Sequence, residues 1–551
     1  MLMILQPRLW AQVCEEQDDK DLQMRASSAL LAVGVAVMTV LASCSPPGGV
    51  SASSGGGTET LTVATDAEPP TFDWPQSTAS ATQLGAIQVL ETLYALDEDY
   101  AAVPQLAADE PDVSSDRLTY TIPLRDDVSF HDGTSMEADD VVASLQRWGE
   151  VSSNGGPFFE HVDTVEATGT HEVTLKLSAP YDVERALAVP IAAAAIMPEE
   201  TVAKYGKDII DNVADIIGTG PYRFTEWRKG RAYELARFGD YEPANNGASG
   251  GLAAAQPGTY ESVVVNIVQE ASTRFQSTAA GQYDVGLSIP GDLYGQFAGQ
   301  QRIEAQTIRP YYSQYLLLDT SEPPFDDPKV RRALALALDQ SKLAEATYGS
   351  KDLFTLNGAI YPSGMGVLSS EEGVSTYDSP DIAQAKALLE DSDYDGQTLT
   401  FMTSQALSQI YNFSVSAAQQ LEAAGFSVEL DVTEWATMNG RYTQPESWDM
   451  FSTAFGIGYS VPSSHLLLNG SFPFEGWYAD DDTMSALVDE WHTARSDSER
   501  GKIMDRIQTQ FYTDQPAVKL GDYSMLNALS TGVSLDEVTF YLPTWWSAQP
   551  R

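Results

Sequence analysis

Cysteine and positively charged residues are both scarce in this chain. Two Cys among 551 residues exclude a disulfide scaffold and a cysteine-rich zinc or iron–sulfur site. Only 31 Lys+Arg face 78 Asp+Glu, which gives a formal net charge of −47 at pH 7. A surface of this charge repels nucleic-acid phosphates and anionic lipid headgroups. Partners held through their phosphates are therefore excluded.

Motifs that carry catalysis or metal binding are also missing. The sequence has no G-x-x-x-x-G-K-[ST], G-x-S-x-G, S-x-x-K or H-E-x-x-H. Residues 391–396 resemble the start of a calcium loop, but the twelfth position is Met402 instead of Glu, so we interpret them as a polar helix-to-strand turn. We expect no enzymatic activity, no cofactor and no metal. The five His lack a His or Cys at ligand spacing: His131, His161, His171, His465 and His492.

Apolar residues, in contrast, are sufficient for large cores. They make up 43% of the chain, and the length exceeds one ordinary domain of about 100–200 residues, so we expect two or more lobes. Alternating apolar patterns predict strands over 61–65, 118–124 and 173–177. The nearly continuous apolar run 263–268 predicts a strand covered on both faces.

Helix boundary signals alternate with these strands. Asp327 followed by Pro328 predicts the start of a helix over 329–348, and Ser379 followed by Pro380 predicts another over 381–389. A helix over 416–424 is expected to stop at Gly425 and to be followed by a strand over 426–432. Repeated helix, short turn and strand indicate an α/β fold.

The N-terminal region carries an export signal. Residues 24–44 read MRASSALLAVGVAVMTVLASC, in which Arg25 precedes an uncharged apolar run of 13 residues, shorter than the roughly 20 that span a membrane. The end of this segment resembles the lipobox of bacterial lipoproteins, in which the signal is cleaved before a lipid-bearing cysteine, here Cys44. Residues 1–23 are acidic, so we expect Met24 to be the true start, 1–43 to be removed and 44–58 to form a lipidated, flexible tether. The alternative is an uncleaved helix with a chance cysteine.

Several motifs along the chain together resemble one family, the solute-binding proteins of peptide/nickel-type ABC importers, family 5. The resemblance covers residues 60–540 with the motifs in order. They are 106–107, 120–125 (YTIPLR), 130–134 (FHDGT), 137–144, 218–222 (GTGPY), 326–339 (DDPKVRRALALALD), 377–378, 383–389, 394–396 (YDG), 419–421, 424–426, 434–435 and 448–450.

The family resemblance implies a two-lobed, type II periplasmic-binding-protein-like α/β fold. In that family the ligand is buried between two lobes joined by two strand-like crossings. By analogy, lobe I comprises 59–90, 215–308 and 510–551, with an inserted subdomain at 91–214, and lobe II comprises 309–509. The Phe-His-Asp-Gly turn around His131 and Asp132 is a fold marker in this family and not a catalytic dyad.

One position departs from the family pattern. Peptide-binding branches usually carry an acidic residue shortly before a Pro, and its carboxylate neutralises the N-terminal ammonium of the peptide. Aligned on Pro462, that position is Gly458. A buried ammonium without its counter-ion costs several kcal/mol, so we expect that ordinary free-amine peptides are not held in the usual way.

Aromatic residues are plentiful around the expected cleft, and flat rings suit sugars or apolar side chains. The alternative for each ring is a place in the core. The expected ligand-binding residues are Gly458, Tyr459, Phe455, Trp435, Trp477 and Trp74.

The leading functional hypothesis is an extracytoplasmic solute-binding lipoprotein of an ABC importer. It would be anchored to the outer face of the cell membrane through Cys44, would capture a peptide or peptide-like solute as a monomer, and would deliver it to a membrane permease. An oligosaccharide is the main rival ligand. Two further hypotheses are a secreted hydrolase and a sensor that shares the fold.

Overall fold

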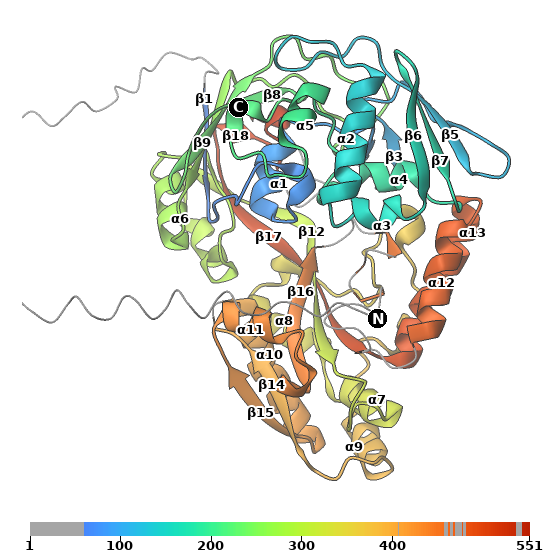
Figure 1. Ribbon diagram of the computed structural model, residues 1–551. Helices are drawn as coiled ribbons and strands as arrows, with labels where there is room; N and C mark the ends of the chain where they lie inside the picture. Colours follow the sequence, from blue (N-terminus) through green and yellow to red (C-terminus); the bar gives the residue numbers. More distant parts are fainter. Residues whose placement is uncertain are drawn as a thin grey trace, which may run out of the picture. The chain divides into compact units, whose positions relative to one another are not determined.

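The central sheet consists of two groups of parallel strands joined by two long strands. The computed structural model describes residues 60–405, 407–456, 461–462, 465, 467–468, 477, 481–535 and 543–551. Within these residues, an 11-stranded sheet has the order β15-β14-β16-β12-β17-β11-β1-β10-β9-β8, and β13 pairs with β17 (Figure 1). Its strands are β1 (Thr60–Thr65), β8 (Tyr222–Arg228), β9 (Ala232–Arg237), β10 (Ser262–Ile267), β11 (Val285–Gly286), β12 (Ile303–Leu318), β13 (Phe354–Thr355), β14 (Thr398–Thr403), β15 (Ser427–Val432), β16 (Met450–Gly456) and β17 (Ala517–Ser530).

Both parallel groups follow the expected strand signals. β1 pairs in parallel with β10 and β11, and β14 pairs in parallel with β15 and β16. The apolar run in β10 predicted cover on both faces, and this is wrong for one face. Val263 and Val265 are buried, whereas Val264 and Asn266 are only half-buried. Asn266 uses its polar side chain on that face to donate to the carbonyl of Val63 at 3.2 Å.

Strands β12 and β17 connect the two parallel groups and are the two crossings that the family resemblance implied. They span 16 and 14 residues and pair antiparallel, with irregularities between Ile308 and Tyr312 and between Gln314 and Tyr315. Gly521 lies at the second irregularity with φ +151°. A Cβ at this position would lie 2.8 Å from the carbonyl oxygen of Thr355, so the close approach of the two backbones requires glycine.

The segment between β1 and β8 carries a second, smaller sheet. Its four strands have the order β4-β5-β7-β6: β4 (Asp112–Val113), β5 (Thr119–Pro123), β6 (Val162–Gly169) and β7 (Glu172–Leu177). Helix α2 (Ala138–Val151) packs on β6 and β7. Strands β2 (Tyr94–Leu96) and β3 (Ala102–Pro104) form a separate pair, as do β18 (Val533–Ser534) and β19 (Gln549–Pro550).

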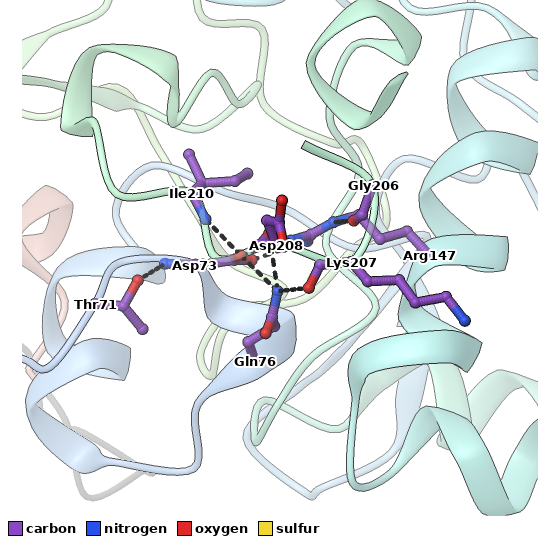
Figure 2. Close-up of polar contacts among 8 residues, drawn as sticks. All are labelled: Thr71, Asp73, Gln76, Arg147, Gly206, Lys207, Asp208 and Ile210. Carbon is purple, nitrogen blue, oxygen red and sulfur yellow. Dashed lines mark hydrogen bonds and ion pairs between the residues drawn. The ribbon is translucent and has the colours of Figure 1, made fainter. Parts of the chain in front are cut away.

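A buried ion pair attaches this smaller sheet region to the loop after β1. Figure 2 shows Arg147 of α2 meeting Asp73 with two hydrogen bonds, of 2.9 and 2.6 Å. The same carboxylate accepts from the backbone N–H of Ile210 at 3.0 Å and from the Gln76 side chain at 3.2 Å. Arg147 also donates to the carbonyls of Gly206 and Asp208. Both side chains are almost fully buried. The hydrogen bonds join three separate chain segments: 73–76, helix α2 and 206–210.

The family turn around His131 serves the structure in a similar way. The His131 Nδ1 atom accepts from the N–H of Gly218 at 3.3 Å, so Nε2 carries the proton that is donated to the Gly220 carbonyl at 2.8 Å. Burial lowers the pKa of His131 to about 4. A Cβ at Gly218 would lie 2.0 Å from the carbonyl oxygen of Val89, which explains the first glycine of the Gly-Thr-Gly motif.

The helix predictions were wrong at three places: the break inside 329–348, the cap before 381, and the start of the helix predicted at 416, which begins at Ser408. The range 329–348 is not one helix but two, α7 (Pro328–Ala337) and α8 (Gln340–Tyr348), because Asp339 begins the second by accepting from the N–H of Lys342. Asp381, and not Ser379, caps α9 (Ile382–Glu390) by accepting from the N–H of Gln384. Helix α10 (Ser408–Ala424) does end at Gly425, and the turn between α9 and β14 lies where the sequence placed it.

Helices α12 (Asp481–Thr493) and α13 (Asp497–Asp514) contact the region of the smaller sheet. The Arg500 guanidinium lies 3.4 Å from the Asp182 carboxylate, and the rings of His492 and Tyr181 stack at 4.8 Å. Arg117 donates to the carbonyl of Ala494. The other helices are α1 (Ser80–Ala86), α3 (Gly155–Phe159), α4 (Val183–Ala188), α5 (Glu199–Tyr205), α6 (Ala271–Ala279) and α11 (Trp435–Arg441).

The core consists of two clusters of buried apolar residues. One extends from β1 and the smaller sheet to the rings of Trp477, Trp491 and Trp545, and the other lies around α7, α8, α10 and β14. In the part of the chain that the structure describes, none of the helices combines the length and apolarity that a membrane crossing needs.

Candidate binding cavity

A cavity of about 710 Å³ lies where the parallel strands of both groups end. Thr65, Asp66 and Ala67 at the end of β1 line one part of it, and residues 287–292 after β11 continue that part. From the other group, Trp435 after β15 and Ala454 of β16 contribute. Ligands of open α/β sheets bind at the carboxyl ends of parallel strands, where the strand order changes direction. This cavity therefore occupies the position that the topology favours for a ligand.

The start of one helix, the end of another and the two crossing strands complete the wall. Residues 407–410 begin α10 directly after β14, and residues 346–349 end α8. Tyr312 of β12 and residues 523–526 of β17 face the cavity from the two crossings. In the second group, β14 is followed by α10 and β15 by α11, so the turns between strand and helix gather at the carboxyl ends of the parallel strands.

Tyrosines form a stacked series along the wall. The ring of Tyr523 lies 5.5 Å from the ring of Tyr312 and 5.1 Å from that of Tyr348, both nearly parallel to it. The Tyr348 hydroxyl donates to the side-chain oxygen of Gln314. Tyr523 therefore packs against two neighbouring tyrosine rings, and the three rings form one aromatic part of the wall.

Among the described residues of the wall, the ionisable groups apart from tyrosines are Asp66, Arg274 and Asp292. Arg274 is 3% exposed, and its guanidinium donates to the backbone carbonyls of residues 268, 269, 287 and 288 at 2.6–2.9 Å. Burial lowers the pKa of Arg274, while the carboxylates of Asp66 and Glu270 oppose this shift. The two wall carboxylates are exposed.

A second buried ion pair lies on β17, just before the cavity-lining residues. Lys519 and Asp522 approach to 2.7 Å with both side chains buried. Ser313 donates to the Asp522 carboxylate at 2.5 Å and Asn357 at 2.7 Å. Burial lowers the pKa of Lys519, and the Asp522 carboxylate opposes that effect. Lys519 and Asp522 therefore neutralise each other and stabilise the crossing strand β17.

The predicted binding residues fall into three groups. Trp435 lines the cavity and is half-buried, and Phe455 is half-buried next to the lining residue Ala454, with its ring 5.8 Å from that of Tyr315. Trp74 and Trp477 are buried outside the cavity lining. The Trp74 indole donates to the carbonyl of Pro190 at 3.0 Å, and the carbonyl of Trp477 accepts from the Thr320 hydroxyl. The predictions for Gly458, Tyr459 and the lipidated Cys44 lie outside the described residues.

Sequence reasoning missed Asp66, Asp292 and the three tyrosines of the wall. One signal was available for Asp66, because it directly follows the predicted strand 61–65 at its carboxyl end. The others come from segments of the chain far apart in sequence, and no local pattern marks them. Within the described residues, no group of three or more His, Cys, Asp or Glu could hold a metal ion.

Comparison with known proteins places this architecture in one family. Residues 101–472, more than half of the chain, match the bacterial extracellular solute-binding proteins, family 5, so this chain belongs to that family. Members are solute-binding proteins of ABC transporters.

Two curated relatives and one solved structure illustrate the similarity. The probable peptide ABC transporter periplasmic-binding protein y4tO of Sinorhizobium fredii is 25% identical over 492 residues, which cover 87% of this chain and 91% of the relative. The glutathione-binding protein GsiB of Pectobacterium atrosepticum is 28% identical over 358 residues, 64% of this chain and 65% of the relative. The ABC transporter substrate-binding protein CtaP of Listeria monocytogenes shares the two-lobed fold, with a TM-score of 0.75 at 21% identity and coverage of 89% of this chain and 99% of the other.

Proposed function

We propose that this protein is the extracytoplasmic receptor of an ABC importer and captures a peptide or peptide-like solute in the cavity described above. The observation that carries the proposal is the position of the cavity, at the carboxyl ends of both parallel strand groups and bordered by the crossings β12 and β17. Its volume of about 710 Å³ lies in the usual range for sites that take up small molecules, roughly 300–1,000 Å³. The function that follows is binding of the solute without its chemical conversion.

The names of the relatives support a peptide-like ligand. One relative is described as a probable peptide transporter component and another as a glutathione-binding protein, and glutathione is itself a tripeptide. The rival oligosaccharide ligand would need an aromatic face, and the half-buried ring of Trp435 is the candidate for it in this wall. The names of the relatives are therefore what favours the peptide-like solute. Capture would end with transfer to a membrane permease.

The anchor belongs to the same proposal. Processing before Cys44 and lipidation of its thiol would hold the folded part at the outer face of the membrane, with residues 45–58 as a flexible tether. Two changes test this part in the producing cell. Cys44→Ser is expected to move the protein from the membrane fraction to the soluble fraction, whereas the neighbouring Ser45→Ala leaves it in the membrane. An unchanged distribution of Cys44→Ser would contradict the anchor.

Native mass spectrometry tests the binding function directly. The full chain would be extracted from cells in mild detergent and measured before and after mild denaturation. We expect a co-purified mass that is released on denaturation and corresponds to a peptide or a peptide derivative. A ladder spaced by hexose units would instead establish the oligosaccharide alternative. A protein without any co-purified solute, and without saturable stabilisation by peptides, sugars or metal chelates, would contradict the receptor function.

A further inference from the structure

A buried amide lies on the crossing strand β12, on the same face of the strand as a lining residue of the cavity. Gln314 is 0% exposed and stands two positions after Tyr312, which lines the cavity. Residues 316–318 of the same strand are also fully buried, but all three are leucine. A buried polar side chain costs free energy unless its hydrogen bonds are formed, so this amide calls for a specific explanation.

The Gln314 amide forms hydrogen bonds with two segments that line the cavity. Its Oε1 atom accepts from the hydroxyl of Tyr348 at the end of α8. Its Nε2 atom donates to the backbone carbonyl of Gln409, in the first turn of α10, at 3.3 Å. Tyr348 and Gln409 both line the cavity. Nε2 also donates to the hydroxyl of Ser452 at 3.0 Å, on the strand β16 that carries the lining residue Ala454.

These hydrogen bonds reach the stacked tyrosines of the wall from two sides. The ring of Tyr348 stacks on the ring of Tyr523, which in turn stacks on that of Tyr312. The side chain of Gln409 is hydrogen-bonded to the hydroxyl of Tyr523. Gln314 therefore holds both Tyr348 and Gln409, the two residues between which Tyr523 is fixed. Buried networks of this kind select one arrangement among those that the side chains could otherwise adopt.

We infer that Gln314 is a positioning residue for solute binding, which holds Tyr348 and the first turn of α10 in the arrangement that the bound solute contacts. This inference rests on the proposed receptor function and adds to it a residue that does not itself line the cavity. Without the amide, the Tyr348 hydroxyl loses this acceptor and the start of α10 loses its link to β12. Several arrangements of the wall then compete with the one that binds, and affinity falls.

Hydrogen–deuterium exchange of the full chain in mild detergent measures the wall without any ligand. Gln314→Met keeps the length of the side chain and removes its hydrogen bonds, and we expect backbone exchange over 344–349 and 408–412 to become about 10-fold faster. The matched control is Gln508→Met in α13, at a fully buried glutamine outside the lining that accepts from the N–H of Ile360 at 2.8 Å. It should leave both segments unchanged. Unchanged exchange of both segments in Gln314→Met would overturn the inference.

Titration calorimetry with Ala-Ala-Ala and with glutathione measures the effect on binding. In Gln314→Met we expect the Kd of the peptide that binds the unaltered protein to rise about 10-fold, and in Gln508→Met less than about 2-fold, although both changes lower the melting temperature. The fraction of protein that retains a co-purified solute is compared in the same variants. Faster exchange with unchanged binding would overturn the positioning role and leave the receptor function intact. Failure of both peptides with the unaltered protein, together with the absence of a co-purified solute, would overturn both.

Gln314→Glu at pH 5 separates the hydrogen bonds from the packing of the side chain. Burial raises the pKa of a carboxyl group, so the glutamic acid is protonated at this pH, accepts from Tyr348 and donates one hydrogen bond in place of the amide. We expect a Kd within about 3-fold of the unaltered protein at pH 5, whereas Gln314→Met remains about 10-fold weaker. Equal losses of affinity in the two variants at pH 5 would overturn the assignment.

Discussion

Asp66 and Asp73 lie in the same segment after β1, yet they use the same chemical group in opposite ways. The Asp73 carboxylate is fully buried and accepts hydrogen bonds from Arg147, Gln76 and the backbone of Ile210 (Figure 2). The Asp66 carboxylate is exposed in the cavity wall with one long contact. Polar groups that form hydrogen bonds inside the protein stabilise the fold. Polar groups of a concave wall that have few such partners are available to bind a ligand.

Breaking the buried pair should have the largest effect. Arg147→Met leaves Asp73 as a buried charge without its cation, and we expect the free energy of unfolding to fall by about 3–5 kcal/mol. Denaturant-induced unfolding measures this loss of free energy. The matched control is Arg506→Met, which breaks the exposed pair with Glu490 and should cost less than about 1 kcal/mol. Equal losses in the two variants would refute a structural role for the buried pair.

The second-largest effect is expected at a buried side chain whose polar atoms form no hydrogen bond with the described residues. His492 is buried, neither ring nitrogen has a partner among the described residues, and burial lowers its pKa to about 4. The nearby charged groups are Asp182, which raises this pKa, and His161 and Arg500, which lower it.

Acid should therefore destabilise the protein through His492. The unfolded chain binds a proton near pH 6.5, but the folded protein does so only near pH 4, so stability present above pH 6.5 is lost as the pH falls toward 4. His492→Phe keeps the stacking on Tyr181 and should remove about 2–3 kcal/mol of this loss. Unfolding curves at pH 8 and pH 4.5 measure the difference. An identical pH dependence in both proteins would show that His492 is not responsible.

A change in the cavity should separate binding from stability. Trp435→Ala removes a half-buried ring from the wall, and we expect ligand affinity to fall by about 1–2 kcal/mol while the melting temperature changes little. Calorimetry with the co-purified solute and a thermal melt measure the two quantities. Trp227→Ala, a partly buried ring outside the cavity, is the control for affinity. A loss of stability without a loss of affinity would assign Trp435 to the core.

The smallest effect is expected at a helix cap. Asp339→Ala removes the acceptor for the N–H of Lys342 at the start of α8, and we expect a loss of about 1 kcal/mol in the free energy of unfolding. Asp339→Asn keeps the capping oxygen and should retain most of the stability. If the alanine variant is as stable as the asparagine variant, the break between α7 and α8 has another cause.

Much of the fold could be predicted from short-range patterns. The strand at 61–65, the cap at Asp327 and the helix stop at Gly425 are all present because their signals depend on a few adjacent residues. The wrong predictions also arise because the signals are local. The predicted helix 329–348 runs across Asp339 because Asp is tolerated inside helices and marks a start only when its side chain turns back to the backbone.

The sequence by itself determined the α/β alternation and the scarcity of positive charge, and its motifs indicated the family, whose resemblance implied two crossings. Only the tertiary structure decided which of the 78 acidic residues face the cavity and which rings line it. Asp66, Asp292, Trp435 and Tyr523 lie in four separate parts of the chain. They line one cavity because the parallel strands of both groups end beside it. Local sequence carries backbone preference, but burial and proximity arise only when distant segments pack against each other.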